Sequence, residues 1–474
     1  MQAQATTTDS GIDRSILDEL IAAVRCPVLL PGSSDYDQAR ALHNGLIERR
    51  PAVIVQCGGV ADVVACVNVA RERGLLLSVK GGGHNVAGNA VNDGGIVIDL
   101  ARMTSVRVDP LARTARVEGG ARWADVDRET QVFGLAVPGG VVSTTGVAGL
   151  TLHGGMGYLR RKHGLSIDNL LSVDIVMADG QVRSVSAAND PDLFWAVRGA
   201  GSNFGVVTSF EFQLHPVGPL VTLCAVFYAQ ADAERVVRAW RDVVTMAPDE
   251  LSSFAVFWSV PAEPPLFPSE LHGTPVVIVN AVYAGGAEEG ERAIQPLREL
   301  ATPLIDLSGP LPYQEVQTLF DPFFPPGLLY YWKSLNLDHL DDAVIDEVCR
   351  LAAERPSERS DLMLWCQGGA IGRVAAEATA FGRRDAPFML LFDSTWRNPE
   401  DSTRNIAWTR SAWSSMQQYS TGGGLYLNFP GLGEESAKLL RSAHGANYAR
   451  LRALKATYDP TNLFRSNLNI PTTG

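Results

Sequence analysis

The chain has 474 residues, of which 46% are hydrophobic and 19% charged, enough for two or three globular domains with a large core. Its net charge of −12 argues against nucleic acid or anionic membranes as partners, because both require a basic surface. The N-terminal residues lack the pattern of a signal peptide, and no apolar stretch could span a bilayer, so the expected location is cytoplasmic.

Helices are expected near Asp13–Val24 and Tyr36–Leu46. A β-α-β unit follows, from "AVIVQC" (Ala52–Cys57) through an amphipathic stretch to "LLLSVK" (Leu75–Lys80). The remaining elements up to residue 217 are a strand at Gly95–Leu100, hairpins at Val106–Gly119 and Leu171–Ser186, a helix at Asp192–Gly199 and a strand at Gly205–Leu214.

From about Pro219 the pattern changes to longer β-rich runs separated by helical stretches such as Asp232–Val244. The runs include "VTLCAVFYA", "FAVFWSV", "PVVIVNAVYA", "LMLWCQ" and "FMLLFDSTW". They predict an antiparallel sheet with helices on one face. A last helix is expected over Ala446–Tyr458, ended by Asp459-Pro460.

Three glycine-rich stretches stand out: "KGGGHNVAG" (Lys80–Gly88), "GVAGLTLHGGMG" (Gly146–Gly157) and "RGAGSNFG" (Arg198–Gly205). Glycine loops can direct several backbone N–H groups at one anion. No P-loop, Rossmann fingerprint or G-x-S-x-G elbow is present. Any one stretch alone is explained by tight turns, but three together, one of them presenting His84, favour a large nucleotide-type cofactor.

Metal chemistry is not expected. The six cysteines form no C-x-x-C pair, and the eight histidines form neither H-x-H nor H-E-x-x-H. Buried, reduced thiols are the prediction for the cysteines.

These stretches, in this order and spacing, resemble the flavin-linked oxidases of the vanillyl-alcohol oxidase and p-cresol methylhydroxylase (PCMH) superfamily, in the berberine-bridge-enzyme-like branch. The resemblance is carried by "GGGHNVAG", "GVAGLTLHGGMG", "DLFWAVRGAGSNFGVVTSFEF" and "NYARLRALKATYDPTNLFRSNLNI". It implies an α+β fold in three parts. Residues 1–217 are a PCMH-type FAD-binding domain of two small α/β subdomains, and residues 218–420 are a substrate domain with an antiparallel sheet covered by helices. Residues 421–474 are a berberine-bridge-like segment that returns to the FAD-binding domain.

The resemblance assigns His84 as the residue bonded to the 8α carbon of FAD. Many members have a second bond from a cysteine, and the matching position here is Val142, which cannot form it. We therefore expect a singly attached flavin, as in the 6-hydroxy-D-nicotine oxidase-like members. The missing second bond also argues against an oligosaccharide as the substrate.

By the same match, further FAD contacts are spread over the three glycine stretches, the preceding "VPGG" loop and the C-terminus. They are Lys80, Gly81, Gly82, Gly83, Asn85, Gly88, Pro138, Gly139, Gly140, Thr144, Thr145, Gly146, Gly149, His153, Gly154, Gly157, Gly201, Gly205, Val206, Val207, Asn467 and Asn469. For His153, a structural hydrogen bond is the alternative role.

Catalysis in this family involves a Y-x-N motif, which matches Tyr426 and Asn428. Tyr426 is the candidate base, and a lid that only packs on substrate is the alternative. A tyrosine of ordinary pKa, ~10, needs a nearby cation or a hydrogen-bond relay to act near neutral pH. Lys333 and Arg373 are the candidate cations. Tyr331 and Lys333 of "YYWKS" are candidate pocket residues, although the aromatic residues of this stretch are explained equally well as part of the hydrophobic core.

The resulting expectation is an FAD-dependent oxidase of secondary metabolism. It would transfer hydride from a small alcohol or amine to flavin, with O2 reduced to H2O2. The alternatives are a dehydrogenase with another electron acceptor and a flavoprotein without turnover. A homodimer is a hypothesis for the oligomeric state.

Overall fold

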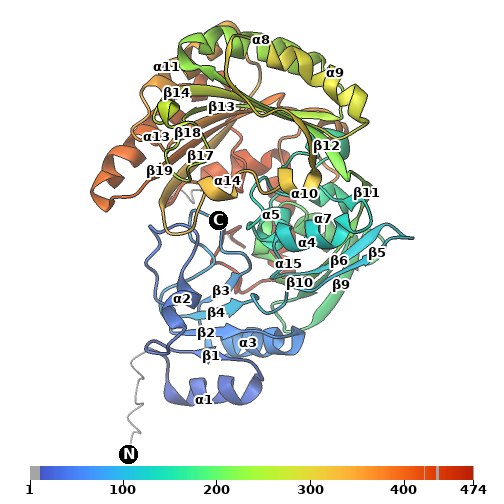
Figure 1. Ribbon diagram of the computed structural model, residues 1–474. Helices are drawn as coiled ribbons and strands as arrows, with labels where there is room; N and C mark the ends of the chain where they lie inside the picture. The colour runs from blue at the N-terminus through green and yellow to red at the C-terminus, as the bar shows by residue number, and fades with distance from the viewer. Residues whose placement is uncertain (1–10, 421, 434–436, 473–474) are drawn as a thin grey trace, which may run out of the picture.

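The N-terminal layer is a four-stranded sheet of order β1–β2–β4–β3 (Figure 1). The computed structural model describes residues 11–420, 422–433 and 437–472. The strands are β1 (Val28–Leu29), β2 (Val53–Gln56), β3 (Leu77–Lys80) and β4 (Ile96–Asp99), and the last three are parallel. The β-α-β prediction is confirmed, with β4 inserted between its two strands.

Three helices accompany this sheet: α1 (Arg14–Ala23), α2 (Tyr36–Arg40) and α3 (Val60–Arg73). Helix α3 ends at Gly74, whose φ of 65° suits a glycine. The predicted helix over Tyr36–Leu46 is wrong beyond Arg40. Beyond Arg40, the side chain of Asn44 donates hydrogen bonds to the carbonyl oxygens of Val86 and Tyr330. These tertiary contacts override the local helical pattern.

A five-stranded antiparallel sheet of order β5–β6–β10–β8–β9 forms the second layer. Both predicted hairpins are confirmed, with the second turning at Asp179-Gly180. The elements are β5 (Val106–Asp109), β6 (Thr114–Glu118), α4 (Trp123–Gln131), α5 (Val147–Leu152), α6 (Arg160–His163), β8 (Leu170–Val176), β9 (Val182–Ser186), α7 (Pro191–Val197) and β10 (Val206–Gln213). Short strands β7 (Leu135–Ala136) and β11 (His215–Pro216) pair with each other.

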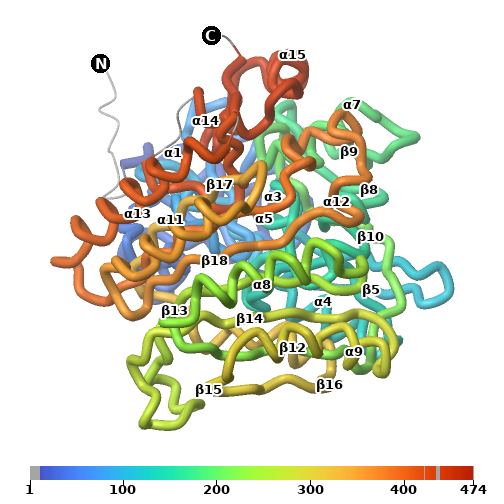
Figure 2. The backbone as a smooth tube through the Cα atoms, turned by 90° about the horizontal axis from the view of Figure 1, so that it is seen from above, coloured from blue at the N-terminus to red at the C-terminus, as the bar shows by residue number. Residues whose placement is uncertain are grey.

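The largest sheet is antiparallel, in the order β15–β12–β14–β13–β18–β19–β17, with β16 also pairing with β12. Its strands are β12 (Leu220–Ala229), β13 (Leu251–Ser259), β14 (Pro275–Tyr283), β15 (Pro303–Asp306), β16 (Gly309–Pro312), β17 (Leu329–Leu337), β18 (Asp361–Cys366) and β19 (Phe388–Trp396). Helices α8 (Ala233–Met246), α9 (Ala287–Arg298), α11 (Asp342–Ala353) and α13 (Ser402–Met416) cover its outer face, as predicted (Figures 1 and 2). Helices α10 (Tyr313–Val316) and α12 (Ala370–Arg373) are short.

Side chains of the large sheet alternate between two cores. Leu335 and Leu390 pack beneath the helices, whereas Met363 and Trp365 belong to the core on the inner face. This inner face is directed at the two N-terminal layers, and the site described below lies between them.

The C-terminal segment returns to the N-terminal half of the molecule. Helix α15 (Tyr448–Tyr458) follows α14 (Ala437–His444) and places Tyr448 and Leu451 in the same core as Phe204 of the first half. Buried Lys455 donates to the carbonyl oxygens of Asn203 and Phe464, which fixes the chain end there. The α+β architecture is as predicted; the exact domain boundaries at residues 217/218 and 420/421 stay predictions.

Candidate active site

The glycine run after β3 permits a backbone-to-backbone contact between two loops. A Cβ atom at Gly82 would collide with the backbone of Gly146, and one at Gly146 would collide with Gly82. Gly83 has a φ of 69°, and its carbonyl accepts a hydrogen bond from the N–H of His43 at 3.1 Å. The run therefore holds the first and second glycine stretches together, with His84 at the end of the contact.

The imidazole of His84 is fixed from two sides. Its Nε2 lies 3.0 Å from Oγ1 of Thr144, and its ring stacks on that of His43 with centroids 4.1 Å apart. His43 stacks in turn on Tyr330 of β17, at 4.8 Å. Burial, aided by His43 and Arg122, holds the pKa of His84 well below its usual range. The ring is therefore neutral near pH 7, the form in which a ring nitrogen can act as a nucleophile.

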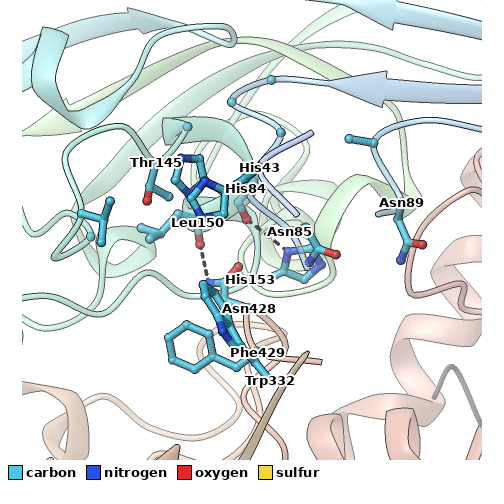
Figure 3. Close-up of a pocket in the computed structure, with 18 of the residues that line it drawn as sticks. His43, His84, Asn85, Asn89, Thr145, Leu150, His153, Trp332, Asn428 and Phe429 are labelled. Carbon is cyan, nitrogen blue, oxygen red and sulfur yellow. Dashed lines mark hydrogen bonds between the residues drawn. The ribbon is translucent and has the colours of Figure 1, made fainter. Parts of the chain in front are cut away.

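His84 lies on the wall of a cavity between the glycine loops and the inner face of the large sheet (Figure 3). About 1240 Å³ of space free of protein atoms lies in this cavity, a figure that includes the open solvent at its mouth. Of the residues predicted from the sequence, it is lined by Gly81, Gly82, Gly83, His84, Asn85, Gly140, Thr145, Gly146, Gly149, His153, Asn467, Tyr426 and Asn428.

The polar atoms of this wall suit FAD. Within the described chain, Nε2 of His153 and Oδ1 of Asn467 are buried without a hydrogen-bond partner, although both residues line the cavity. A Cβ at Gly149 would meet no protein atom within 4 Å, so the helix start of α5 is open to a ligand. An imidazole and an amide oxygen, which need partners when buried, complement the carbonyl and N–H groups of a flavin. The residues present therefore fit the group.

The other predicted FAD contacts do not line this cavity, and they stay predictions. Gly157 and Gly139 pack backbone against backbone, Gly201 lies against the imidazole of His153, and Lys80 donates its Nζ to the carbonyl of Ala39 at 2.6 Å. Their close packing explains several of these glycines without a ligand. The residues in question are Lys80, Gly88, Pro138, Gly139, Thr144, Gly154, Gly157, Gly201, Gly205, Val206, Val207 and Asn469.

His153 lines the cavity and also bonds through Nδ1 to the carbonyl of Gly149, at 3.1 Å, so the structural hydrogen bond is observed and the contact with FAD stays a prediction. Val142 lies on the same wall. None of the six cysteines, all free thiols, is among the cavity-lining residues of the described chain.

Tyr426 and Asn428 meet at one oxygen atom. The phenolic oxygen of Tyr426 accepts hydrogen bonds from the backbone N–H groups of Gly155 and Met156, each at 3.0 Å, and from Nδ2 of Asn428 at 2.8 Å. Asn428 also donates to the carbonyl of Leu150, as Figure 3 shows. Burial raises the pKa of Tyr426 to about 12, while these three donors lower it by stabilising the charged form.

The prediction that Tyr331, Lys333 and Arg373 belong to the pocket is wrong for this cavity. Strand β17 directs Tyr331 and Lys333 to its outer side, where Tyr331 accepts from Arg410 and Lys333 lies 3.7 Å from the ring centroid of Trp413. Arg373 pairs instead with Asp249 at 2.6 Å. The partners of the Tyr426 oxygen in the described chain are therefore N–H groups, and neither predicted cation is among them.

The residue of "YYWKS" that does line the cavity is Trp332, and alternation along β17 is the signal that could have identified it. Met156 and Ser202, which also line the cavity, lie inside the glycine stretches expected to contact FAD. Leu150, Phe429, Ser466 and Leu468 lie within or directly beside the quoted motifs but were not singled out. Lining residues outside these motifs were not predicted; they are His43, Val79, Asn89, Ala90, Val141, Phe324 and Trp365.

Among the described residues, no group of three or more His, Cys, Asp or Glu side chains could hold a metal ion. No helix within the same ranges is long and apolar enough to cross a membrane.

Comparison with known proteins gives a consistent result. Residues 51–186 match a family described as "FAD binding domain", and residues 425–471 match "Berberine and berberine like". The chain is 31% identical to the uncharacterized FAD-linked oxidoreductase YgaK of Bacillus subtilis, over 92% of this chain and 95% of that protein. It is also 31% identical to (R)-6-hydroxynicotine oxidase of Paenarthrobacter nicotinovorans, over 95% and 98% respectively. The crystal structure of 6-hydroxy-D-nicotine oxidase from Arthrobacter nicotinovorans superposes with a TM-score of 0.85 at 30% identity, covering 95% of this chain and 98% of that one.

Proposed function

Because the chain belongs to the berberine-bridge-enzyme-like branch of the FAD-linked oxidoreductases, we propose that it oxidises a small alcohol or amine with FAD bonded covalently to His84. We further propose that O2 takes up the electrons and leaves as H2O2. The enzyme class and the cofactor follow from the family; the covalent bond, the substrate and the electron acceptor are the proposal.

One observation carries the covalent attachment. His84 lies at the wall of the cavity with a neutral imidazole, oriented by Thr144 and by the stacked ring of His43. In the described part of the chain no cysteine lines this cavity, and Val142 stands where a second attachment would be expected. His84 is therefore the single attachment point in this proposal.

When bound, FAD supplies the acceptor for the hydride. The chain supplies the group that accepts the proton, and for an alcohol that proton leaves the substrate O–H as the C–H bond breaks. Tyr426 fills this role as its phenolate, whose oxygen already accepts three hydrogen bonds. An alcohol that loses a hydride and a proton becomes a carbonyl compound, and an amine that does so becomes an imine.

Asn428 has two functions in this arrangement. Its Nδ2 donates both to Tyr426 and to the carbonyl of Leu150, so it holds the end of α5 and the phenolic oxygen in one geometry. Together with the N–H groups of Gly155 and Met156, it stabilises a negative charge at that oxygen in the way an oxyanion hole does.

The test separates oxidase from dehydrogenase. Holoenzyme mixed anaerobically with a panel of alcohols and amines should lose its flavin colour with a substrate. Admission of O2 should restore the colour and release one H2O2 per flavin. Bleaching that O2 does not reverse within seconds would favour another acceptor. A cytoplasmic location, a role in secondary metabolism and a homodimer stay predictions.

A further inference from the structure

Strand β17 is an edge strand of the large sheet, and loops of the candidate site cover its free edge. On its other side it pairs with β19. At the free edge, the N–H of Tyr330 donates to Oδ1 of Asn44 at 3.0 Å, and the N–H of Asn336 donates to the carbonyl of Gly424 at 3.0 Å. The backbone groups of an edge strand need such partners, because no neighbouring strand pairs with them. One of the two loops also carries Tyr426.

Ser334 lies between these two contacts along β17 and bonds to Tyr426 itself. Alternation along the strand places its side chain on the inner face with that of Trp332, and Ser334 is 0% exposed. Its Oγ accepts a hydrogen bond from the backbone N–H of Tyr426 at 3.0 Å, and it donates to the carbonyl oxygen of the same residue at 3.4 Å. One hydroxyl thus contacts both backbone polar groups of the candidate base.

The stretch around Tyr426 has no helix or strand of its own to determine its path. Residues 423–426 have no regular secondary structure, and in the turn that follows the N–H of Phe429 donates to the carbonyl of Tyr426 at 2.9 Å. The ring of Phe429 meets the indole of Trp332 edge-on, with centroids 5.8 Å apart. Ser334 and Trp332, two residues apart on β17, therefore hold the two ends of this turn.

The backbone position of Tyr426 decides whether its side chain reaches its hydrogen-bond donors. The phenolic oxygen accepts from the backbone N–H groups of Gly155 and Met156, each at 3.0 Å, on the other side of the cavity from β17. Backbone donors cannot follow a phenol that moves, and a hydrogen bond weakens as its distance and angle depart from the optimum. A displaced Tyr426 would therefore lose stabilisation of a negative charge on its oxygen.

We propose that Ser334 is a positioning residue for the oxidation: its hydroxyl fixes the backbone of Tyr426, so that the phenolic oxygen meets its donors and can accept the substrate proton. The inference deepens the proposed function and rests on it. Ser334 is not among the cavity-lining residues of the described chain, so its effect passes through Tyr426.

The first test measures the ionisation of Tyr426 without any substrate. The tyrosines of the full-length protein are replaced biosynthetically by difluorotyrosine, whose phenol ionises in milder alkali, and the fluorine NMR signal absent from Tyr426→Phe is assigned to residue 426. In Ser334→Ala the titration midpoint of this signal should rise by about 0.5 pH unit or more, because the phenolate loses donors while it stays buried. Ser334→Thr, which keeps the hydroxyl, should titrate as wild type does. A midpoint that is unchanged or lower in Ser334→Ala overturns the inference.

Ser394→Ala is the matched control for a lost hydroxyl. Ser394 is another serine of the large sheet with 0% exposure, but its hydroxyl bonds to that of Thr409 in α13 at 2.7 Å. This control should leave the midpoint of residue 426 unchanged, and an equal shift in both variants contradicts the assignment. If Ser334→Ala does not fold, Ser334→Cys replaces it, because a thiol is only a weak hydrogen-bond acceptor. It should show the same upward shift.

A double-mutant cycle then tests the path of the effect. Flavin reduction is followed anaerobically with the alcohol or amine of the panel that bleaches the wild-type holoenzyme fastest. Ser334→Ala should slow this reduction roughly tenfold with flavin content unchanged. Combined with Tyr426→Phe it should cause no further loss, because two residues that act through one group are not additive. Equal slowing by Ser334→Ala in both backgrounds contradicts a role through Tyr426.

Failure of this inference differs from failure of the proposed function. If Tyr426→Phe slows flavin reduction but Ser334→Ala changes neither the midpoint nor the rate, only the role of Ser334 is refuted. If Tyr426→Phe reduces its flavin at the wild-type rate, the base of the proposed function is refuted. The fluorine titration then still reports whether Ser334 orients the phenol.

Discussion

The imidazole of His43 lies flat against that of His84, with ring centroids 4.1 Å apart and planes 20° apart. Tyr330 stacks on the far side of His43, so the large sheet supports the ring to which we assign the flavin. Asn44, the next residue, donates to the carbonyls of Val86 and Tyr330 at 2.8 and 2.9 Å. This short segment thus ties the His84 loop to β17 and keeps a neutral imidazole at the cavity wall.

Thr144 orients His84 through a single 3.0 Å hydrogen bond. Replacing it with valine removes the hydroxyl at nearly constant shape, so the ring should lose its preferred tautomer and position. We expect Thr144→Val to carry a smaller fraction of covalent flavin than wild type, measured as flavin colour in acid-precipitated protein. Thr144→Ser, which keeps the hydroxyl, should restore the fraction. Full attachment in the valine variant would show that the hydrogen bond is dispensable.

Tyr426→Phe removes the oxygen at which three donors converge. If Tyr426 is the base, flavin reduction by substrate should slow by roughly 10²–10⁴-fold with flavin content unchanged. A pKa near 12 keeps most of the wild-type phenol protonated at neutral pH, so the wild-type rate should rise with pH and the variant's should not. Tyr458→Phe, altered at a distant hydroxyl bonded to Asp190, is the control. If Tyr426→Phe reduced its flavin at the wild-type rate, Tyr426 would not be the base, and only its role as a lid over the substrate would remain.

Gly82 and Gly149 should respond differently to alanine. At Gly82 the new methyl would collide with the backbone of Gly146, so the free energy of unfolding should fall by about 1–3 kcal/mol. At Gly149 no protein atom lies within 4 Å, so the fold should be unaffected while the methyl occupies cofactor space. Denaturant titration and the flavin-to-protein absorbance ratio separate the two effects. A Gly149→Ala protein with full flavin content would show that FAD does not approach this helix.

Asp127 predicts a pH dependence of stability. Burial raises its pKa from 3.8 to about 7, although Gln317 donates to its Oδ2 at 3.1 Å. Between these two pH values the folded state holds a proton that the unfolded state has released, so this carboxyl lowers stability as pH rises through that window.

Asp127→Asn removes this effect while preserving shape. Its free energy of unfolding relative to wild type should therefore increase from pH 4 to pH 7, by at most about 1.4 kcal/mol per pH unit. Denaturant unfolding of both proteins at several pH values provides the difference, in which contributions from buried histidines cancel. A constant difference across the window would mean that Asp127 is ionised in the folded protein.

Much of the fold was predictable because local signals agreed with the tertiary structure. Asp179-Gly180 specifies a hairpin whatever surrounds it, and the apolar spacing of Val60–Arg73 specifies a helix. The segment after Arg40 was not predictable, because its path is set by hydrogen bonds from Asn44 to Val86 and Tyr330. These partners lie 42 and 286 positions further along the chain. No local pattern contains that information.

Site residues were predictable where a motif determines the backbone conformation. They were less predictable on a strand, where alternate side chains point to opposite faces of the sheet and only one set points into the cavity. "GGGH" and "YLN" both lie at the cavity. In "YYWKS" the residue types suggested a pocket, but the period of the strand places Trp332 inside and Tyr331 and Lys333 outside. Which set faces inward depends on how β17 pairs with β19, a long-range choice.

The central claim, a flavin bonded to His84, is tested most directly by mass spectrometry of the acid-denatured protein. The account predicts an intact mass increased by one FAD, with the added mass mapped to the peptide that contains His84 and absent from His84→Ala. Flavin released into the acid supernatant, or found on any other residue, would contradict it.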